Sequence, residues 1–278
     1  MTTMPRTAAL PSSSLRVFDL SLGQMLWSRR TVFMSLVVGG PVMMALLVAI
    51  VDAAGVGGVE INGVRLNGSA VFGMMIWIFY LRFTVPVLAV FYGTSLIADE
   101  VEDKTITYLF TRPIPRAAVL IGKYLAYLAC TTMVVLPSVM LVYFLIVPRG
   151  GSLAETFPSL VIDLGILFLG LAVYGAMFAA VGAWLKRPVL TGLLYVFGWE
   201  PVILVLPGYL KKLTVAHYLQ SLVPHAMPAD NSAVAILTTL FRETPPVPVA
   251  LAALSAMLAV FLWLATRAVE RREYVLDQ

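Results

Sequence analysis

Six apolar runs long enough to cross a lipid bilayer constrain this chain more than any other feature of its sequence. A transmembrane helix needs about 20 predominantly apolar residues, and such runs recur from one end of the chain to the other. The predicted fold class is therefore an all-α membrane protein, a single domain over residues 1–278 with six transmembrane helices. We expect the six spans at residues 33–51, 70–98, 117–147, 160–184, 189–207 and 247–266.

The overall composition supports this interpretation. Hydrophobic residues make up 60% of the chain, charged residues make up 12%, and the mean hydropathy is +0.92. A water-soluble fold could not bury that much apolar surface. The net charge of +4 does not indicate a nucleic-acid partner, because the basic residues form short clusters at the ends of apolar runs. The single cysteine, Cys130, offers neither a disulfide framework nor a thiolate metal site.

The basic residues also predict the orientation. An even number of spans places both termini on one side of the membrane. Of the nineteen Lys and Arg residues, thirteen lie on that side, five lie on the other, and Arg82 falls within a span. Because Lys and Arg concentrate in cytoplasmic segments, we expect both termini to be cytoplasmic.

Three segments outside the spans have recognisable patterns. Residues 12–30 place apolar side chains on one helical face, which predicts an amphipathic helix on the membrane surface. Residues 59–66, VEINGVRL, alternate around Asn62-Gly63, the strongest short signal for a β-hairpin. Residues 208–246 are long and only moderately polar, which predicts one or two short helices at the outer membrane interface or dipping into it.

The connection between the second and third spans, DEVEDKTITYLFTRPIPRAAVLIGK, is the most distinctive segment. We expect a helix that begins near Asp99, where its acidic residues would favour the positive end of the helix dipole. Pro113 and Pro115 cannot continue that helix, so the segment at residues 99–115 should end there. A short apolar stripe, suited to the membrane surface or to a groove in a partner protein, consists of Ile106, Leu109 and Phe110. A solvated loop with an ordinary charged face is the alternative.

This connection resembles the coupling helix of type-2 ABC exporter permeases. Their E, GT, LL, P-x-x-R and GK pattern matches this chain at Glu100, Thr105, Leu109, Pro113, Arg116 and Lys123. Lys104 departs from the pattern, because many members have glycine there. The surface helix, the six spans and the outer helical segment extend the resemblance over nearly the whole chain. In that family the coupling helix docks on the ATPase.

The resemblance implies a non-catalytic permease subunit of an ATP-driven exporter in the bacterial cytoplasmic (inner) membrane. The chain has no G-x-x-x-x-G-K-[ST] motif, so we expect ATP and Mg²⁺ on a separate ATPase and no cofactor on this chain. The implied partners are two ATPase subunits, a second permease copy or a paralogue, and membrane lipids. The expected substrate is hydrophobic, amphipathic or lipid-like; the alternative within the family is mechanical transmission to an external partner.

Arg82 and Glu200 are ionisable residues inside apolar runs, which makes them candidate functional residues. Counting about 1.5 Å per residue places Arg82 roughly 18 Å and Glu200 roughly 16 Å from opposite membrane surfaces, near the midplane. They could line or gate a pathway, or form a fixed ion pair that joins two helices. Pro201 could break the fifth span beside Glu200.

The sequence predicts no catalytic site and no metal site. His217, His225 and Met227 lie in the outer segment, but two histidines without a carboxylate or cysteine array are more typical of interfacial packing. An ion-gradient-driven secondary transporter or channel is the alternative function, and it predicts several intramembrane carboxylates, whereas the spans hold Glu200 and, near a span end, Asp163. An intramembrane enzyme is disfavoured, because the spans contain no His or Asp constellation.

Overall fold

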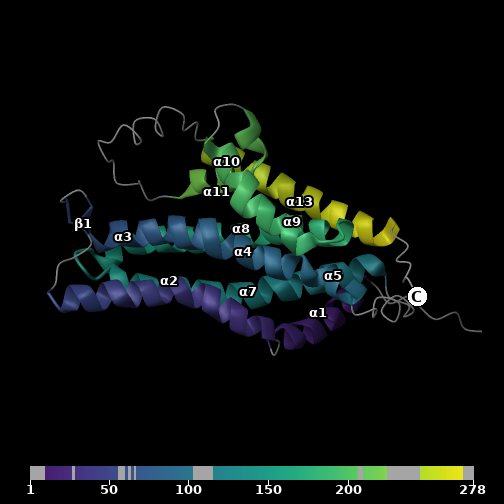
Figure 1. The fold of residues 1–278 in the computed structure, drawn as a ribbon, viewed down its shortest axis with the longest axis horizontal. Helices are drawn as coiled ribbons and strands as arrows, with labels where there is room; N and C mark the ends of the chain where they lie inside the picture. Colours follow the sequence, from purple (N-terminus) through teal and green to yellow (C-terminus); the bar gives the residue numbers. More distant parts are fainter. Residues whose placement is uncertain are drawn as a thin grey trace, which may run out of the picture.

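The computed structural model describes residues 10–26, 29–55, 60–61, 64–65, 67–102, 115–205, 209–223 and 245–271. Apart from one small hairpin, these residues form helices (Figure 1). In chain order the elements are α1 (Leu10–Leu26), α2 (Arg29–Ala53), β1 (Glu60–Ile61), β2 (Val64–Arg65), α3 (Gly68–Met75), η1 (Ile76–Thr84), α4 (Val85–Leu88), η2 (Ala89–Gly93), α5 (Ser95–Glu102), α7 (Arg116–Ile146), α8 (Leu153–Trp184), α9 (Pro188–Leu194), η3 (Tyr195–Trp199), α10 (Glu200–Val205), η4 (Tyr209–Leu213), α11 (Val215–Leu222) and α13 (Val247–Arg271).

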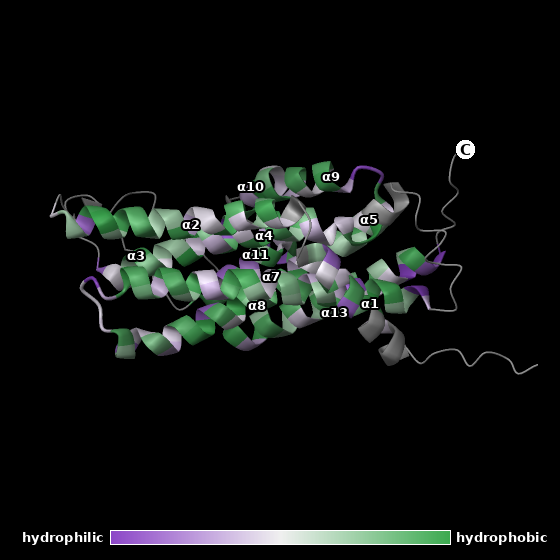
Figure 2. Ribbon diagram, turned by 90° about the horizontal axis from the view of Figure 1, so that it is seen from below, coloured by the Kyte–Doolittle hydropathy of each residue, from purple (hydrophilic) through white to green (hydrophobic). Residues whose placement is uncertain are grey.

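Five helices in the described part of the chain are long and apolar enough to cross a membrane. They are Thr31–Ala53, Gly68–Ala98, Arg116–Ile146, Leu153–Trp184 and Val247–Arg271. The expected fifth span corresponds to a shorter apolar helix, Pro188–Leu204. The all-helical membrane fold is thus confirmed, and the six-span layout stays a prediction. Figure 2 shows hydrophobic residues along most of the length of the long helices.

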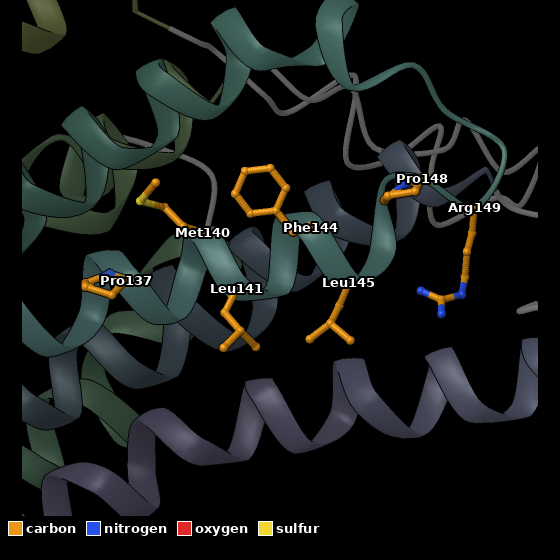
Figure 3. Close-up of a pocket in the computed structure, with 7 residues that line it drawn as sticks. All are labelled: Pro137, Met140, Leu141, Phe144, Leu145, Pro148 and Arg149. Atoms are coloured by element: carbon orange, nitrogen blue, oxygen red, sulfur yellow. The ribbon is translucent and has the colours of Figure 1, made fainter.

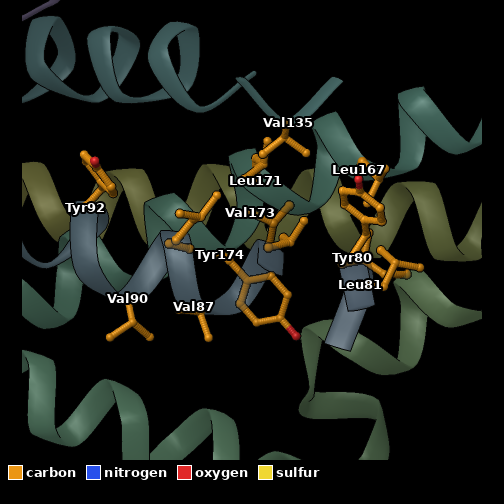
Figure 4. Packing of buried hydrophobic residues seen from close by; sticks show 14 of the residues in the cluster. Tyr80, Leu81, Val87, Val90, Tyr92, Val135, Leu167, Leu171, Val173 and Tyr174 are labelled. Carbon is orange, nitrogen blue, oxygen red and sulfur yellow. The ribbon is translucent and has the colours of Figure 1, made fainter. Parts of the chain in front are cut away.

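The bundle is built around α8, the most buried of these five helices. The second span packs against α8, α7 lies beside it, and α13 runs along it. On the far side of α7 lie α1 and α2 (Figure 1). Buried side chains from the second span, α7 and α8 meet in one apolar core (Figure 4).

Polar and small residues join the central helices. The hydroxyl of Tyr124 donates to the carbonyl of Ala172 at 2.8 Å, and that of Tyr127 donates to the carbonyl of Leu171 at 3.0 Å, so α7 is bonded to α8. A Cβ atom on Gly93 would lie 3.1 Å from the carbonyl oxygen of Gly175, so the second span approaches α8 closely there. Lipid supplies no hydrophobic drive between helices, and such contacts therefore carry much of the packing.

The predicted hairpin is present between α2 and α3. β1 and β2 pair antiparallel, with Glu60 opposite Arg65 and Ile61 opposite Val64. Asn62 and Gly63, the expected turn residues, lie outside the described residues.

At the same end of the bundle, Arg149 forms an ion pair with Asp52 at 3.3 Å. This pair connects the turn between α7 and α8 to the end of α2. Figure 3 shows Arg149 at one end of an apolar pocket, in which Leu141 and Leu145 of α7 point toward α2.

The described residues of the segment before α13 form two short helices, η4 and α11. Leu219 of α11 faces Gly170, which lies near the middle of α8. Accordingly, α10 and α11 lie beside the middle of the bundle and not at the end that carries β1 (Figure 1). Where this segment lies relative to the outer membrane interface stays a prediction.

The helix expected to begin near Asp99 does not begin there. Asp99 and Glu100 lie in the last turns of α5, and α5 continues the second span without a break. Leu96 and Ile97 are almost fully buried, so the packed face of the span extends up to this point. The expected favourable contact between these acids and a helix N-terminus is therefore wrong for α5.

Candidate functional site

Arg82 and Glu200 both lie at π-helical segments, where the helix is wider than an α-helix. Arg82 is part of η1, and Glu200 directly follows η3. Pro86 and Pro201 lack the amide hydrogens that an α-helix would bond to the carbonyls four residues earlier, those of Arg82 and Phe197. This loss favours the wider winding in both helices. The break considered at Pro201 does not occur, because the helix runs on to Leu204.

Glu200 is buried, with 4% of its surface exposed, and its carboxylate has defined partners. The hydroxyl of Tyr174 lies 2.7 Å from one carboxylate oxygen and 2.8 Å from the other, and donates to them. The backbone amide of Ala216 donates to the carboxylate at 3.1 Å. Glu200 thereby joins three elements: its own helix, α8 and α11.

The contact with Ala216 caps the N-terminus of α11. Thr214 holds the N-cap position but makes no side-chain capping bond, because its hydroxyl donates to the carbonyl of Lys211 at 2.8 Å. The first amides of a helix lack partners within the helix, and negative charge is favourable there. Glu200 supplies both an acceptor and a charge from another helix.

Arg82 is exposed on the surface of the chain. Its guanidinium carbon lies 4.4 Å from the ring centroid of Trp77, a cation–π contact. The two residues are five apart, and the i→i+5 bonding of a π-helix brings such residues close to alignment. Trp77 therefore depends on the π-helical winding to reach Arg82.

The structure brings Arg82 and Glu200 into one neighbourhood without a direct ion pair. Each side chain attracts the other electrostatically. Among the described residues, however, no bond joins them, and the carboxylate is held by Tyr174 and Ala216 instead. Figure 4 shows Tyr174 among the buried side chains of the second, third and fourth spans.

Aromatic side chains from two helices continue the surface beside Arg82. Phe83 and Phe197 lie with their ring centroids 6.2 Å apart and are 42% and 54% exposed. The second span and the shorter apolar helix Pro188–Leu204 thus share one exposed apolar face, and Arg82 places a cation beside it.

The structure describes only some of the residues that match the coupling-helix pattern. Glu100 lies in α5, while Thr105, Leu109 and Pro113 lie outside the described residues. Arg116 begins α7, directly after Pro115, and donates to the carbonyl of Glu270 in α13 at 3.5 Å.

The glycine of the GK pair has a packing role. A Cβ atom on Gly122 would lie 2.6 Å from the carbonyl oxygen of Ser14 and 2.8 Å from the Cβ of Val17. Only a residue without a side chain lets α1 pack this closely on α7.

His217 lies in α11, while His225 and Met227 are outside the described residues. In the described part of the chain, no three His, Cys, Asp or Glu residues group as metal ligands would.

Sequence reasoning missed the residues that hold the candidate site together. Tyr174 lies in an uninterrupted apolar run and Ala216 contributes only its backbone, so neither differs in pattern from its neighbours. The contact of Trp77 with Arg82 could have been predicted only by assuming a π-helix, which brings residues five apart onto one side.

The long apolar helices and the charged residues among them define a multi-pass membrane protein with a polar cluster inside its bundle. The sequence profile of the ABC-2 family transporter proteins matches residues 21–274. The chain belongs to this family and is a membrane permease, the non-catalytic subunit of an ABC transporter. None of the curated proteins compared with the chain matches it significantly. The resemblance read from residues 99–123 is thus confirmed at the level of the family.

Proposed function

We propose that this permease couples ATP hydrolysis by a separate ATPase subunit to the export of a hydrophobic, amphipathic or lipid-like substrate. The observation that carries the proposal is the family match over residues 21–274. ABC-2 permeases generally pair with ABC ATPase subunits, which bind and hydrolyse the ATP. The assembly we propose contains two ATPase subunits and two permeases, either two copies of this chain or this chain and a paralogue.

The proposed topology has six spans, with Pro188–Leu204 as the fifth, in the cytoplasmic membrane of a bacterium. Both termini are cytoplasmic. The positions of the basic residues support this orientation. The end of α13, which Arg271 closes, lies opposite the hairpin (Figure 1), and Arg116 bonds to the neighbouring Glu270.

Coupling requires a stiff connection between the ATPase and the membrane. The second span supplies one, because helical structure runs from Gly68 to Glu102 through Arg82 and directly into the proposed docking segment. We assign the ATPase contact to Glu100, Thr105, Leu109 and Pro113 in that segment and to Arg116, which directly follows it. Tilting of the second and fifth spans would then open a path past Arg82 and Glu200.

The test is copurification with the ATPase encoded in a neighbouring gene. Glu100→Lys reverses a charge in the docking segment and should reduce both the bound ATPase and the ATP-dependent transport, while membrane insertion stays unchanged. Glu155→Lys is a matched control, since Glu155 is exposed in the first turn of α8, at the opposite end of the bundle. The Glu155→Lys variant should bind the ATPase and transport the substrate as the wild type does.

Two results would contradict the assignment. Equal ATPase binding and transport by the Glu100→Lys variant and the wild type would remove the docking role from this segment. Transport that continues without any ATPase and follows an ion gradient would support the secondary-transporter alternative.

A further inference from the structure

Among the residues that the structure describes, no acceptor bonds to the cation of Arg82, which lies in an apolar helix. It lies well inside the apolar helix Gly68–Ala98 and is exposed on the surface of the chain. Within the described residues, its guanidinium contacts the ring of Trp77. The indole nitrogen of Trp77 is itself buried with no acceptor among those residues. The guanidinium and this indole nitrogen therefore have no bonded oxygen partner in the described part of the chain, and a charge without such a partner inside an apolar helix is costly.

The chain does not supply that oxygen from its own spans. In the described part of the structure, the carboxylates well inside apolar helices are those of Glu200 and Asp163. Glu200 is engaged by Tyr174 and Ala216, and no bond between described residues joins it to Arg82. Asp163 is fully buried in α8.

The described spans of a second copy would not supply it either. Both carboxylates are buried within their own protomer, so neither lies on a face that a second copy could present. The described spans therefore leave the anion that bonds to Arg82 to come from another molecule.

The surroundings of Arg82 indicate what kind of molecule this is. Phe83 and Phe197 form an exposed aromatic pair from two spans, and Ile78, four residues before Arg82 on the second span, is also exposed. A cation beside an apolar face complements a ligand with an anionic group and an apolar body. The guanidinium can bind a phosphate, sulfate or carboxylate through two parallel hydrogen bonds.

We propose that Arg82 is the anion-binding residue of the permease, and that its substrates are amphipathic molecules with an anionic group. The anionic group bonds to the guanidinium of Arg82, while the apolar part lies against Phe83 and Phe197. This proposal rests on the proposed transport function and names the substrate class of the same site.

The experiment compares ligands with the same alkyl chain and different head groups. Radiolabelled dodecyl phosphate and dodecyltrimethylammonium are titrated against the full-length permease in lipid nanodiscs, alone and with its ATPase. We expect wild-type protein to bind the phosphate about tenfold more tightly than the ammonium compound. Equal affinities of the wild type for the two ligands would overturn the proposal, and this measurement needs no variant.

Three variants assign the preference to Arg82. Arg82→Gln should lower the affinity for dodecyl phosphate about tenfold, and Arg82→Lys should keep the preference for the anion because it keeps the charge. Arg149→Gln is the matched control, since Arg149 pairs with Asp52 at the end of the bundle. This variant should bind dodecyl phosphate with the affinity of the wild type. A full preference for the phosphate in Arg82→Gln would also overturn the proposal.

The same samples separate this proposal from the transport function. Binding is measured on the permease alone, whereas stimulation of ATP hydrolysis by dodecyl phosphate is measured on the complex. A selective anion site in a permease that binds no ATPase would contradict the transport function and leave the anion site supported. A complex whose ATP hydrolysis responds equally to both head groups would contradict the anion site alone.

Discussion

At the scale of single residues, Glu200 links three helices through one carboxylate. Its carboxylate accepts hydrogen bonds from the hydroxyl of Tyr174 on α8 and from a backbone amide in the first turn of α11. Its own backbone belongs to the apolar helix Pro188–Leu204. Hydrogen bonds to a charged group contribute about 1.5–3 kcal/mol each, and a buried partner left without an acceptor costs a similar amount. The position of α11 beside the middle of α8 therefore depends on Glu200.

A double-mutant cycle between Glu200 and Tyr174 tests this link. Glu200→Leu should lower the free energy of unfolding more than Glu200→Gln, because the amide oxygen of glutamine still accepts a bond. With Tyr174→Phe, the coupling energy should be about 1–3 kcal/mol. The measurement is unfolding of the purified protein in sodium dodecyl sulfate.

The corresponding cycle between Glu200 and Arg82 is the comparison. An ion pair between these two residues is one of the two interpretations of the sequence, whereas no bond between described residues joins them in the structure. We expect a smaller coupling energy here than between Glu200 and Tyr174. If the effects of the Glu200 and Tyr174 substitutions on the free energy of unfolding simply add, the carboxylate does not hold α8 and α11 together.

At the scale of elements, α1 is packed onto α7 through a glycine. The backbone of α1 at Ser14 and the side chain of Val17 occupy the space that a side chain at position 122 would need. Because α7 begins six residues earlier, at Arg116 directly after the proposed docking segment, we expect a shift of that segment to be transmitted to α1 as well.

Gly122→Leu should push α1 away from α7. Inserting a side chain into a filled interface costs about 1–3 kcal/mol, so the thermal unfolding midpoint of the purified permease should fall. Gly165→Leu is the matched control, because a Cβ atom on Gly165, on the exposed surface of α8, would meet nothing within 4 Å. Equal midpoints for the two variants would show that α1 does not depend on this contact.

At the scale of the whole molecule, the two ends of the bundle differ. One end carries the hairpin and the ion pair between Arg149 and Asp52. The other carries α1, the end of α5 and the end of α13 (Figure 1). Our proposed orientation places the second end in the cytoplasm.

Cysteine labelling in intact cells tests this orientation. The buried Cys130 is first replaced by alanine, and single cysteines are then introduced as Asn62→Cys, Asn231→Cys and Asp277→Cys. The first two should react with a membrane-impermeant thiol reagent, and the third should react only after lysis. Labelling of Asp277→Cys in intact cells would exclude an even number of spans with cytoplasmic termini.

Local composition was sufficient to predict much of this architecture. In lipid, a backbone without internal hydrogen bonds is too costly, so an apolar run of sufficient length becomes a helix whatever lies beside it. The Asn62-Gly63 pair likewise indicated the hairpin, and the charges of Arg82 and Glu200 stood out within apolar runs. The family pattern at residues 99–123 identified the class of protein.

Tertiary structure alone decided how these helices meet. The extension of α5 past Asp99, the packing of α1 on Gly122 and the bond from Tyr174 to Glu200 all depend on which faces adjoin. Apolar surface is equally satisfied by lipid and by another helix, so hydrophobicity determines that a segment crosses the membrane but not which neighbour it packs against. Close backbone approaches and single hydrogen bonds make that choice, and they join residues too far apart in the chain to form a pattern in the sequence.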